Sequence, residues 1–192
     1  WNERQGYPAP ARWLFAWQER WGFRHADALT VASKWLAAQA RTLGARRVAH
    51  VPNGVDLAMY PRRPSRAPDE PTALLLTRFV EFTPARLVDI WSPVHARQPT
   101  ARLIVAGDTT GDSGRIARRM MAAALPQAHV HWRGLVPFTD IPSLCAQADV
   151  ALFPAEAHRI NRAKCPARLA DVMAAGLAVV AARIGEHETY VR

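Results

Sequence analysis

Two cationic side chains, Arg78 and Lys164, have positions suited to binding an anion. Arg78 directly follows the apolar segment 73–77, which is typical of a buried strand, and a guanidinium there could hold two phosphate oxygens. Lys164 is one of two lysines in the chain. It lies just before a predicted helix, where a cation and the helix dipole would both favour an anion. Position alone is equally compatible with two solvated surface side chains.

A carboxylate in the same predicted helix, Asp171, could accept hydrogen bonds from a ribose. Helical periodicity by itself favours an exposed aspartate here. The glycine-rich stretch 107–114 follows a predicted strand and begins a helix, but it lacks the Gly-Lys-Ser/Thr ending of a phosphate-binding P-loop. We therefore interpret this stretch as an ordinary strand-to-helix turn.

Other familiar chemistries have no support in the sequence. The seven histidines contain no His-x-x-x-His pair, so we predict no metal site. No Gly-x-Ser-x-Gly segment is present, which argues against a serine hydrolase. Cys145 and Cys165 have neither metal-ligand nor disulfide spacing, and we expect two reduced thiols in a cytoplasmic protein.

The chain is strongly basic, with a formal net charge of +9. Nearly all the positive charge comes from scattered arginines and no nucleic-acid-binding motif is present, so we predict no nucleic-acid partner. The positive field would instead attract an anionic substrate. If the second substrate, the acceptor, is a lipid, this charge would also favour peripheral association with an anionic membrane surface at the inner face of the membrane. No apolar run reaches the roughly 18 residues needed to span a bilayer.

The order of predicted elements indicates an α/β fold. From residue 73 onward, short apolar strands alternate with helices, which predicts a parallel sheet with helices on both faces. Because the strands are continuous apolar runs, we expect both of their faces to be covered. The predicted strands are 73–77, 102–106, 130–132, 150–153 and 178–182, and the predicted helices are 84–97, 114–125, 141–148 and 165–175.

The first part of the chain is organised differently. A Trp-rich helix over 8–24 precedes a strand at 28–31, a helix at 35–43 with Ser33 as its N-cap, and a strand at 47–51. The proline-rich stretch 61–71 is typical of a linker. We therefore divide the chain into residues 1–60, a linker at 61–71 and a second domain at 72–192.

Five segments, in this order, resemble the family 4 retaining glycosyltransferases. They are "ADALTVASKWLAAQARTLGARRVAHVPNGVD" at 26–56, "LLLTRF" at 74–79, "RLIVAGD" at 102–108, "VHWRGLVPFTDIPSLCAQADVALFP" at 130–154 and "RLADVMAAGLAVVAARIGEHETYV" at 168–191. The resemblance implies a GT-B fold, in which two Rossmann-like domains face a cleft and the carboxy-terminal one binds the nucleotide. Residues 1–60 would then be the end of the acceptor domain, and 72–192 an incomplete donor domain.

The resemblance also implies a reaction and a site. A sugar would pass from a nucleotide diphosphate-sugar donor to a glycan, lipid or small-molecule acceptor, with retention of anomeric configuration and without a metal or other cofactor. The residues that it assigns to the site are Arg78 and Lys164 at the diphosphate, with Arg168 one turn later, Gly134, Leu135 and Val136 around the base, and Asp171 at the ribose.

Two departures from the family pattern concern the donor sugar. The family has two glutamates separated by seven residues, and Asp171 occupies the second position while Ala163 occupies the first. We expect Glu156 or His158 to reach the sugar instead. The family also has a lysine a few residues after the arginine. Thr83 lies near that position here, and Lys164 would replace the lysine.

The alternatives are a non-catalytic sugar-nucleotide-binding subunit, favoured by Ala163, and another Rossmann-type protein such as an epimerase. The epimerase would need a Gly-x-Gly-x-x-Gly segment, which is missing. We expect the chain to be cut from a longer enzyme and to be inactive alone, since a GT-B enzyme reacts between two domains.

Overall fold

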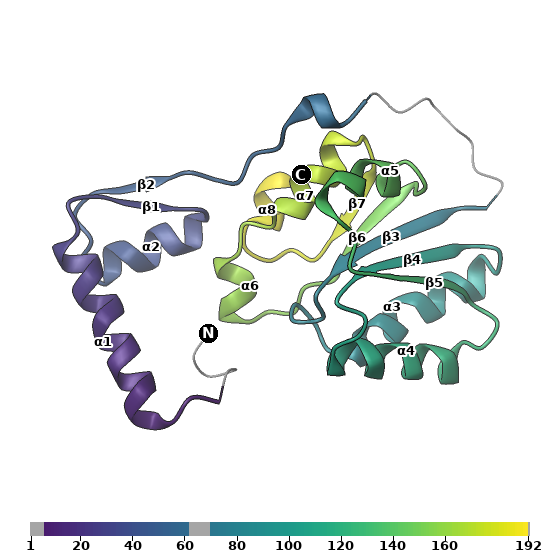
Figure 1. Cartoon of the computed structure of the whole chain (residues 1–192), viewed down its shortest axis with the longest axis horizontal. Coiled ribbons are helices and arrows are strands. Elements are labelled where there is room, and N and C mark those ends of the chain that lie inside the picture. The colour runs from purple at the N-terminus through teal and green to yellow at the C-terminus, as the bar shows by residue number, and fades with distance from the viewer. Residues whose placement is uncertain (1–5, 62–69, 192) are drawn as a thin grey trace.

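A parallel five-stranded sheet forms the centre of the structure (Figure 1), a computed structural model that describes residues 6–61 and 70–191. The strand order is β5-β4-β3-β6-β7, and every neighbouring pair is parallel. The strands are β3 (Thr72–Thr77), β4 (Arg102–Gly107), β5 (His129–Gly134), β6 (Val150–Phe153) and β7 (Ala178–Ala181). The chain adds strands on one side of β3 and then returns to its other side, so the order reverses between β3 and β6. This α/β arrangement with helices on both faces confirms the predicted fold class.

Alternation along the strands divides the core into two layers. One side of the sheet packs against α3 (Pro84–Arg97) and α4 (Asp112–Ala124), and the other against α5 (Ile141–Cys145) and α7 (Ala167–Ala174) (Figure 1). Leu75 belongs to the first layer, together with Trp91 of α3. Leu74, the preceding residue, belongs to the second layer with Leu169 of α7. Successive strand side chains point to opposite faces, and here both faces are apolar because both are covered.

The outer strands correct one prediction. We expected every strand to be covered on both faces, but side chains along β5 and β7 alternate between exposed and half-buried. These strands lie at the edges of the sheet, where fewer helices cover them. Among the helices, α5 ends at Cys145 instead of residue 148, and α7 begins at Ala167 because Pro166 is its N-cap. The short helix α6 (Arg159–Ala163) was not predicted.

The first part of the chain forms a smaller group of elements beside the large sheet (Figure 1). Two short parallel strands, β1 (Leu29–Val31) and β2 (Val48–His50), lie with α1 (Ala9–His25) and α2 (Lys34–Thr42). The Ser33 hydroxyl accepts a hydrogen bond from the Leu36 amide at 3.1 Å, as expected of an N-cap. Of the predicted linker, residues 62–69 lie outside the described residues, and the division at 61–71 stays a prediction.

Hydrogen bonds join this smaller group to the large sheet. The Glu186 carboxylate, just before α8 (His187–Tyr190), accepts from the Lys34 amide at 2.5 Å. The Asn53 side-chain amide donates to the Cys165 carbonyl at 2.6 Å. These contacts fix the segment around Asn53 above the carboxyl ends of the large sheet's strands.

The helix α1 exposes much of its apolar surface. Trp13, Trp17 and Trp21 are 70%, 51% and 54% exposed, and their spacing of four places them on one helical stripe. Within residues 6–61 and 70–191, no helix is both long enough and apolar enough to cross a membrane.

Candidate functional site

A cavity of about 770 Å³ lies at the carboxyl ends of the large sheet's strands. Residues 75–78 at the end of β3 and residues 152–155 at the end of β6 line it. The strand order reverses between these two strands, and open parallel sheets bind ligands in the crevice at such a point. Gly107, at the end of β4, also lines the cavity. It has φ +138, and a Cβ atom there would lie 1.6 Å from the Thr77 carbonyl oxygen, so only glycine allows this approach.

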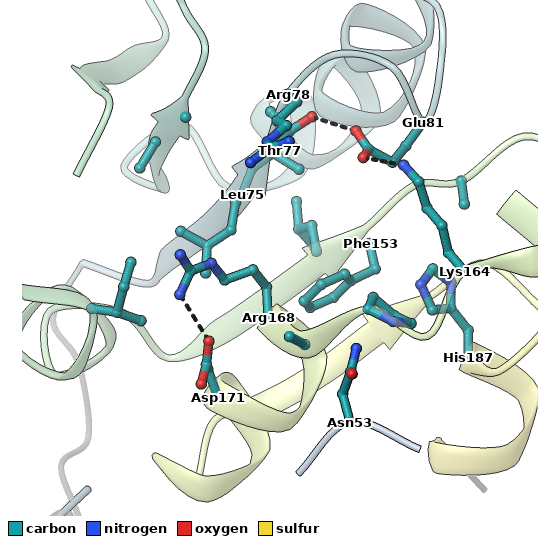
Figure 2. A pocket seen from close by; sticks show the side chains of 18 of the residues that line it. Asn53, Leu75, Thr77, Arg78, Glu81, Phe153, Lys164, Arg168, Asp171 and His187 are labelled. Atoms are coloured by element: carbon teal, nitrogen blue, oxygen red, sulfur yellow. Dashed lines mark hydrogen bonds and ion pairs between the residues drawn. The ribbon is translucent and has the colours of Figure 1, made fainter. Parts of the chain in front are cut away.

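Most of the predicted site residues line this cavity. They are Arg78, Lys164, Arg168, Asp171, Leu135 and Val136. Figure 2 shows the charged members arising from the end of β3, from the loop before α7 and from α7 itself. Gly134 is not a lining residue, but it ends β5 with φ +67 and directly precedes Leu135. The fold thus brings together side chains that are separated by up to 93 positions (78 to 171) in the sequence.

Lys164 is held by a carboxylate that sequence reasoning missed. Its ammonium donates to Glu81 Oε1 at 2.7 Å, and the two side chains are 33% and 28% exposed. The Thr77 hydroxyl donates to Glu81 Oε2 at 3.2 Å (Figure 2). The available signal was a carboxylate three residues after Arg78, in the loop at a strand end. Its pairing with Lys164 spans 83 positions and follows only from the folded chain.

The pair with Lys164 keeps Glu81 ionised. Burial alone would raise the pKa of Glu81, but the hydrogen bond and positive charge of Lys164, together with a backbone hydrogen bond and one from Thr77, outweigh burial. The pKa therefore lies below its ordinary value of 4.5. At neutral pH the cavity wall carries a carboxylate and an ammonium in direct contact.

Asp171 is buried, which corrects the expectation from helical periodicity. It is 4% exposed, and its carboxylate accepts from Arg168 Nη1 at 2.9 Å (Figure 2). Tyr60 lies close to this carboxylate. Burial raises the pKa of Tyr60, and the nearby Asp171 raises it further. The Arg168 guanidinium also lies 5.4 Å from the centre of the Phe138 ring. The face of α7 that carries Asp171 is therefore covered by residues from other parts of the chain. Helical periodicity alone does not predict this cover.

His187 adds a neutral imidazole to the cavity wall. Burial lowers its pKa, and a hydrogen bond to the Ala182 carbonyl opposes this only in part. Nδ1 lies 3.3 Å from that carbonyl oxygen, which can only accept, so Nδ1 carries the proton of the neutral ring. Sequence reasoning did not identify this residue.

Glu156 and His158 do not line the cavity. Glu156 Oε1 accepts from the Thr83 amide at 2.8 Å and from its hydroxyl at 2.7 Å, at the start of α3. His158 Nδ1 accepts from the Asn161 amide at 3.3 Å, as the N-cap of α6. Each side chain meets an amide at a helix start, where backbone donors lack partners in their own helix. The expectation that either would reach a donor sugar has no support in this arrangement.

The lining combines groups suited to an anionic, hydroxyl-bearing ligand. Arg78, Lys164 and Arg168 can donate to phosphate oxygens, whereas carboxylates such as Asp171 can accept from hydroxyl groups. Apolar side chains of Leu135, Val136 and Phe138 form another part of the wall. In the described part of the chain, no group of three or more His, Cys, Asp and Glu side chains is placed to hold a metal ion.

Comparisons with solved structures agree with this fold. The Anabaena protein HepE, solved with UDP and glucose, superimposes with a TM-score of 0.68 at 19% identity, over 89% of this chain and 48% of HepE. Sucrose-phosphate synthase from Thermosynechococcus elongatus gives 0.63 at 20% identity, over 89% of this chain and 44% of that one. The pneumococcal O-GlcNAc transferase GtfA, solved with UDP and GlcNAc, gives 0.67 at 14% identity, over 87% and 33%. The chain therefore spans about half of these proteins or less, and at these identities the likeness establishes the fold.

Sequence comparison identifies the family. No curated protein sequence matches the chain. Residues 1–54 match a family described as "Glycosyl transferase 4-like domain". Residues 70–192, which include all the predicted site residues, match the family described as "Glycosyl transferases group 1". The match at 70–192 covers more than half of the chain, which therefore belongs to the group 1 glycosyltransferase family.

Proposed function

We propose that the chain carries the donor-binding part of an enzyme that transfers a sugar from a nucleotide diphosphate-sugar to an acceptor, with retention of anomeric configuration. The observation that carries the proposal is the cavity between β3 and β6, where Arg78, Lys164 and Arg168 line the crevice at the reversal of strand order. Family membership supports the reaction class. The UDP complexes of HepE and GtfA support a nucleoside diphosphate as part of the ligand.

In this proposal, each part of the donor has its own partners. Arg78 and Lys164 bind the diphosphate and stabilise the negative charge that grows on it as the sugar leaves. These two side chains take the place of a metal ion or other cofactor. Leu135 and Val136, which follow Gly134, contact the base, and Asp171 accepts from the ribose hydroxyls while Arg168 holds it in place. The acceptor is a glycan, a lipid or a small molecule. For a lipid acceptor, the basic surface favours peripheral binding to an anionic membrane.

A second candidate is a subunit that binds the sugar nucleotide without turning it over. Ala163 favours it, because the family places a carboxylate at that position and an alanine cannot contact a sugar hydroxyl through a polar side chain. Measurable release of the sugar from a bound donor separates the two candidates. The anomeric configuration of the product, determined by NMR, tests retention.

The test begins with calorimetric titrations of UDP, GDP and ADP into the parent chain and an Arg78→Ala variant. We expect one nucleotide to bind the parent. The variant should bind it at least about tenfold more weakly, because a charge-assisted hydrogen bond contributes about 1.5–3 kcal/mol. In a form of the enzyme that has both domains and transfers the sugar, turnover should fall by more than affinity, since the charge on the diphosphate grows in the transition state.

Arg102→Ala is the matched control. Arg102 begins β4 at the opposite end of the sheet and pairs with Glu70 at 3.0 Å, so its loss should leave nucleotide affinity unchanged. A parent chain that binds none of the three nucleotides would contradict the proposal, and so would equal losses in the two variants.

A further inference from the structure

Glu81 places an ionised carboxylate in the cavity wall, beside the basic side chains that we propose bind the phosphates. It follows Arg78 by three residues, and its side chain is 28% exposed. Its oxygens accept from Lys164 Nζ, from the Thr77 hydroxyl and from the Val80 amide, at 2.7, 3.2 and 3.3 Å. A carboxylate has about four acceptor positions, so acceptor capacity remains.

The loop that carries Glu81 is held by residues that follow β6. The Glu81 carbonyl accepts from Asn161 Nδ2 at 2.6 Å and from the Glu156 amide at 2.9 Å. Asn161 itself is 5% exposed. A side chain held in this way presents its carboxylate in one position before any ligand arrives, which lowers the entropic cost of binding.

The other carboxylates near the cavity already have defined tasks. Within residues 6–61 and 70–191, the carboxylates that line it are Asp56, Glu81 and Asp171. Asp56 accepts from the Ala58 amide at 3.0 Å in a local turn, and Asp171 pairs with Arg168. Glu156 bonds to Thr83 at the start of α3, outside the cavity lining.

The charge of Glu81 determines which part of a donor it can meet. A carboxylate repels phosphate oxygens, so in an anion site it must face a hydrogen-bond donor. In a nucleotide diphosphate-sugar, the transferred sugar is bonded to the terminal phosphate. With Lys164 bound to the terminal phosphate, as proposed above, Glu81 would lie beside that sugar, whose hydroxyls are donors. We propose that Glu81 accepts a hydrogen bond from a hydroxyl of the donor sugar and so selects which sugar the site takes. This inference rests on the proposed function.

The test compares a nucleotide with and without its sugar. UDP and UDP-glucose, and in parallel GDP and GDP-mannose, are titrated calorimetrically into the parent chain, Glu81→Gln and the control Glu70→Gln. Glu70 also forms an ion pair, with Arg102, but it lies before β3 at the far end of the sheet. In Glu81→Gln, affinity for the nucleotide-sugar should fall at least about tenfold relative to affinity for the bare diphosphate. Glu70→Gln should keep the parent's ratio.

The outcomes separate Glu81's role from the wider proposal. Equal losses for the diphosphate and the nucleotide-sugar would mean that Glu81 only orients Lys164, and this would overturn the inference, as would an unchanged ratio. A parent chain that binds neither diphosphate removes the proposed function and the Glu81 role together. If circular dichroism shows that Glu81→Gln does not fold, Glu81→Asp replaces it. Aspartate keeps the charge but withdraws it by one methylene, and the same change in ratio is expected.

Discussion

At the scale of single residues, the site is a set of compensated charges. Glu81 pairs with Lys164, and Asp171 pairs with Arg168, within one cavity. The Glu81–Lys164 pair is partly exposed, at 28% and 33%, and such a pair contributes little to stability, about 0–1 kcal/mol. This pair therefore matters more for the orientation of donors and acceptors toward a ligand than for holding the fold together.

The first residue-scale prediction concerns Asp171→Asn. We expect nucleotide affinity to fall by about 1–3 kcal/mol, because the buried carboxylate would lose its charged hydrogen bonds to the ribose. Calorimetric titration with the nucleotide that the parent binds measures the change.

Asp112→Asn is the control for this substitution. Asp112 and Arg115 form an ion pair with the same spacing of three residues on α4, but the Asp112 side chain is 87% exposed. Its replacement should leave affinity within experimental error. Unchanged affinity in Asp171→Asn would refute the ribose assignment.

At the scale of elements, the loops at the strand ends are tied to one another. The loop after β3 and the loop after β6 both line the cavity, and Glu156 of the second loop and Asn161 of α6 bond to the first loop. These loops come from neighbouring strands, so the parallel register of β3 and β6 sets their separation.

The element-scale prediction is that Glu156→Ala destabilises the fold without changing nucleotide affinity. The substitution removes two hydrogen bonds to Thr83 and a negative charge at the N-terminus of α3, together a loss of about 1–2 kcal/mol. Chemical denaturation measures the loss, and nucleotide titration of the folded variant should reproduce the parent. A large fall in affinity for the nucleotide-sugar, with no fall for the bare diphosphate, would instead support Glu156 as a contact of the donor sugar.

At the scale of the whole molecule, one buried carboxylate joins the two groups of elements. Glu186 is 2% exposed, accepts from the Lys34 amide at the start of α2, and lies 4.0 Å from His50 Nε2. It immediately precedes His187, which lines the cavity. The contact between the smaller group and the large sheet is thus built beside the candidate site.

The corresponding prediction concerns Glu186→Ala, which leaves the Lys34 amide without this acceptor. An unsatisfied buried donor costs about 1–3 kcal/mol, so amide hydrogen exchange at the start of α2 should accelerate by about tenfold or more. Glu188→Ala is the matched control, since Glu188 lies in α8, two residues after Glu186, and pairs with Arg183 on the surface. Equal exchange in the two variants would show that Glu186 does not hold the groups together.

The sequence by itself determined the order of elements and their approximate limits. Strand and helix periods are local properties, so β6 and α3 appear at the predicted residues, and Ser33 caps α2 as expected. Position within a parallel sheet also placed Arg78 and Lys164 at the cavity, because strand ends and the loops beside them gather at one edge. The limits of α5 and α7 were less accurate, since the ends of short helices depend on packing.

The tertiary structure alone decided the partners of the charged residues. Glu81 contacts Lys164 across 83 positions, and Glu156 reaches Thr83 across 73. Asp171 is buried although its helix position favoured exposure, because Tyr60 and Arg168 surround it. No periodicity links residues so far apart. Their contacts arise because β3 and β6 are neighbours in the sheet. This brings the loops that follow the two strands within hydrogen-bonding distance.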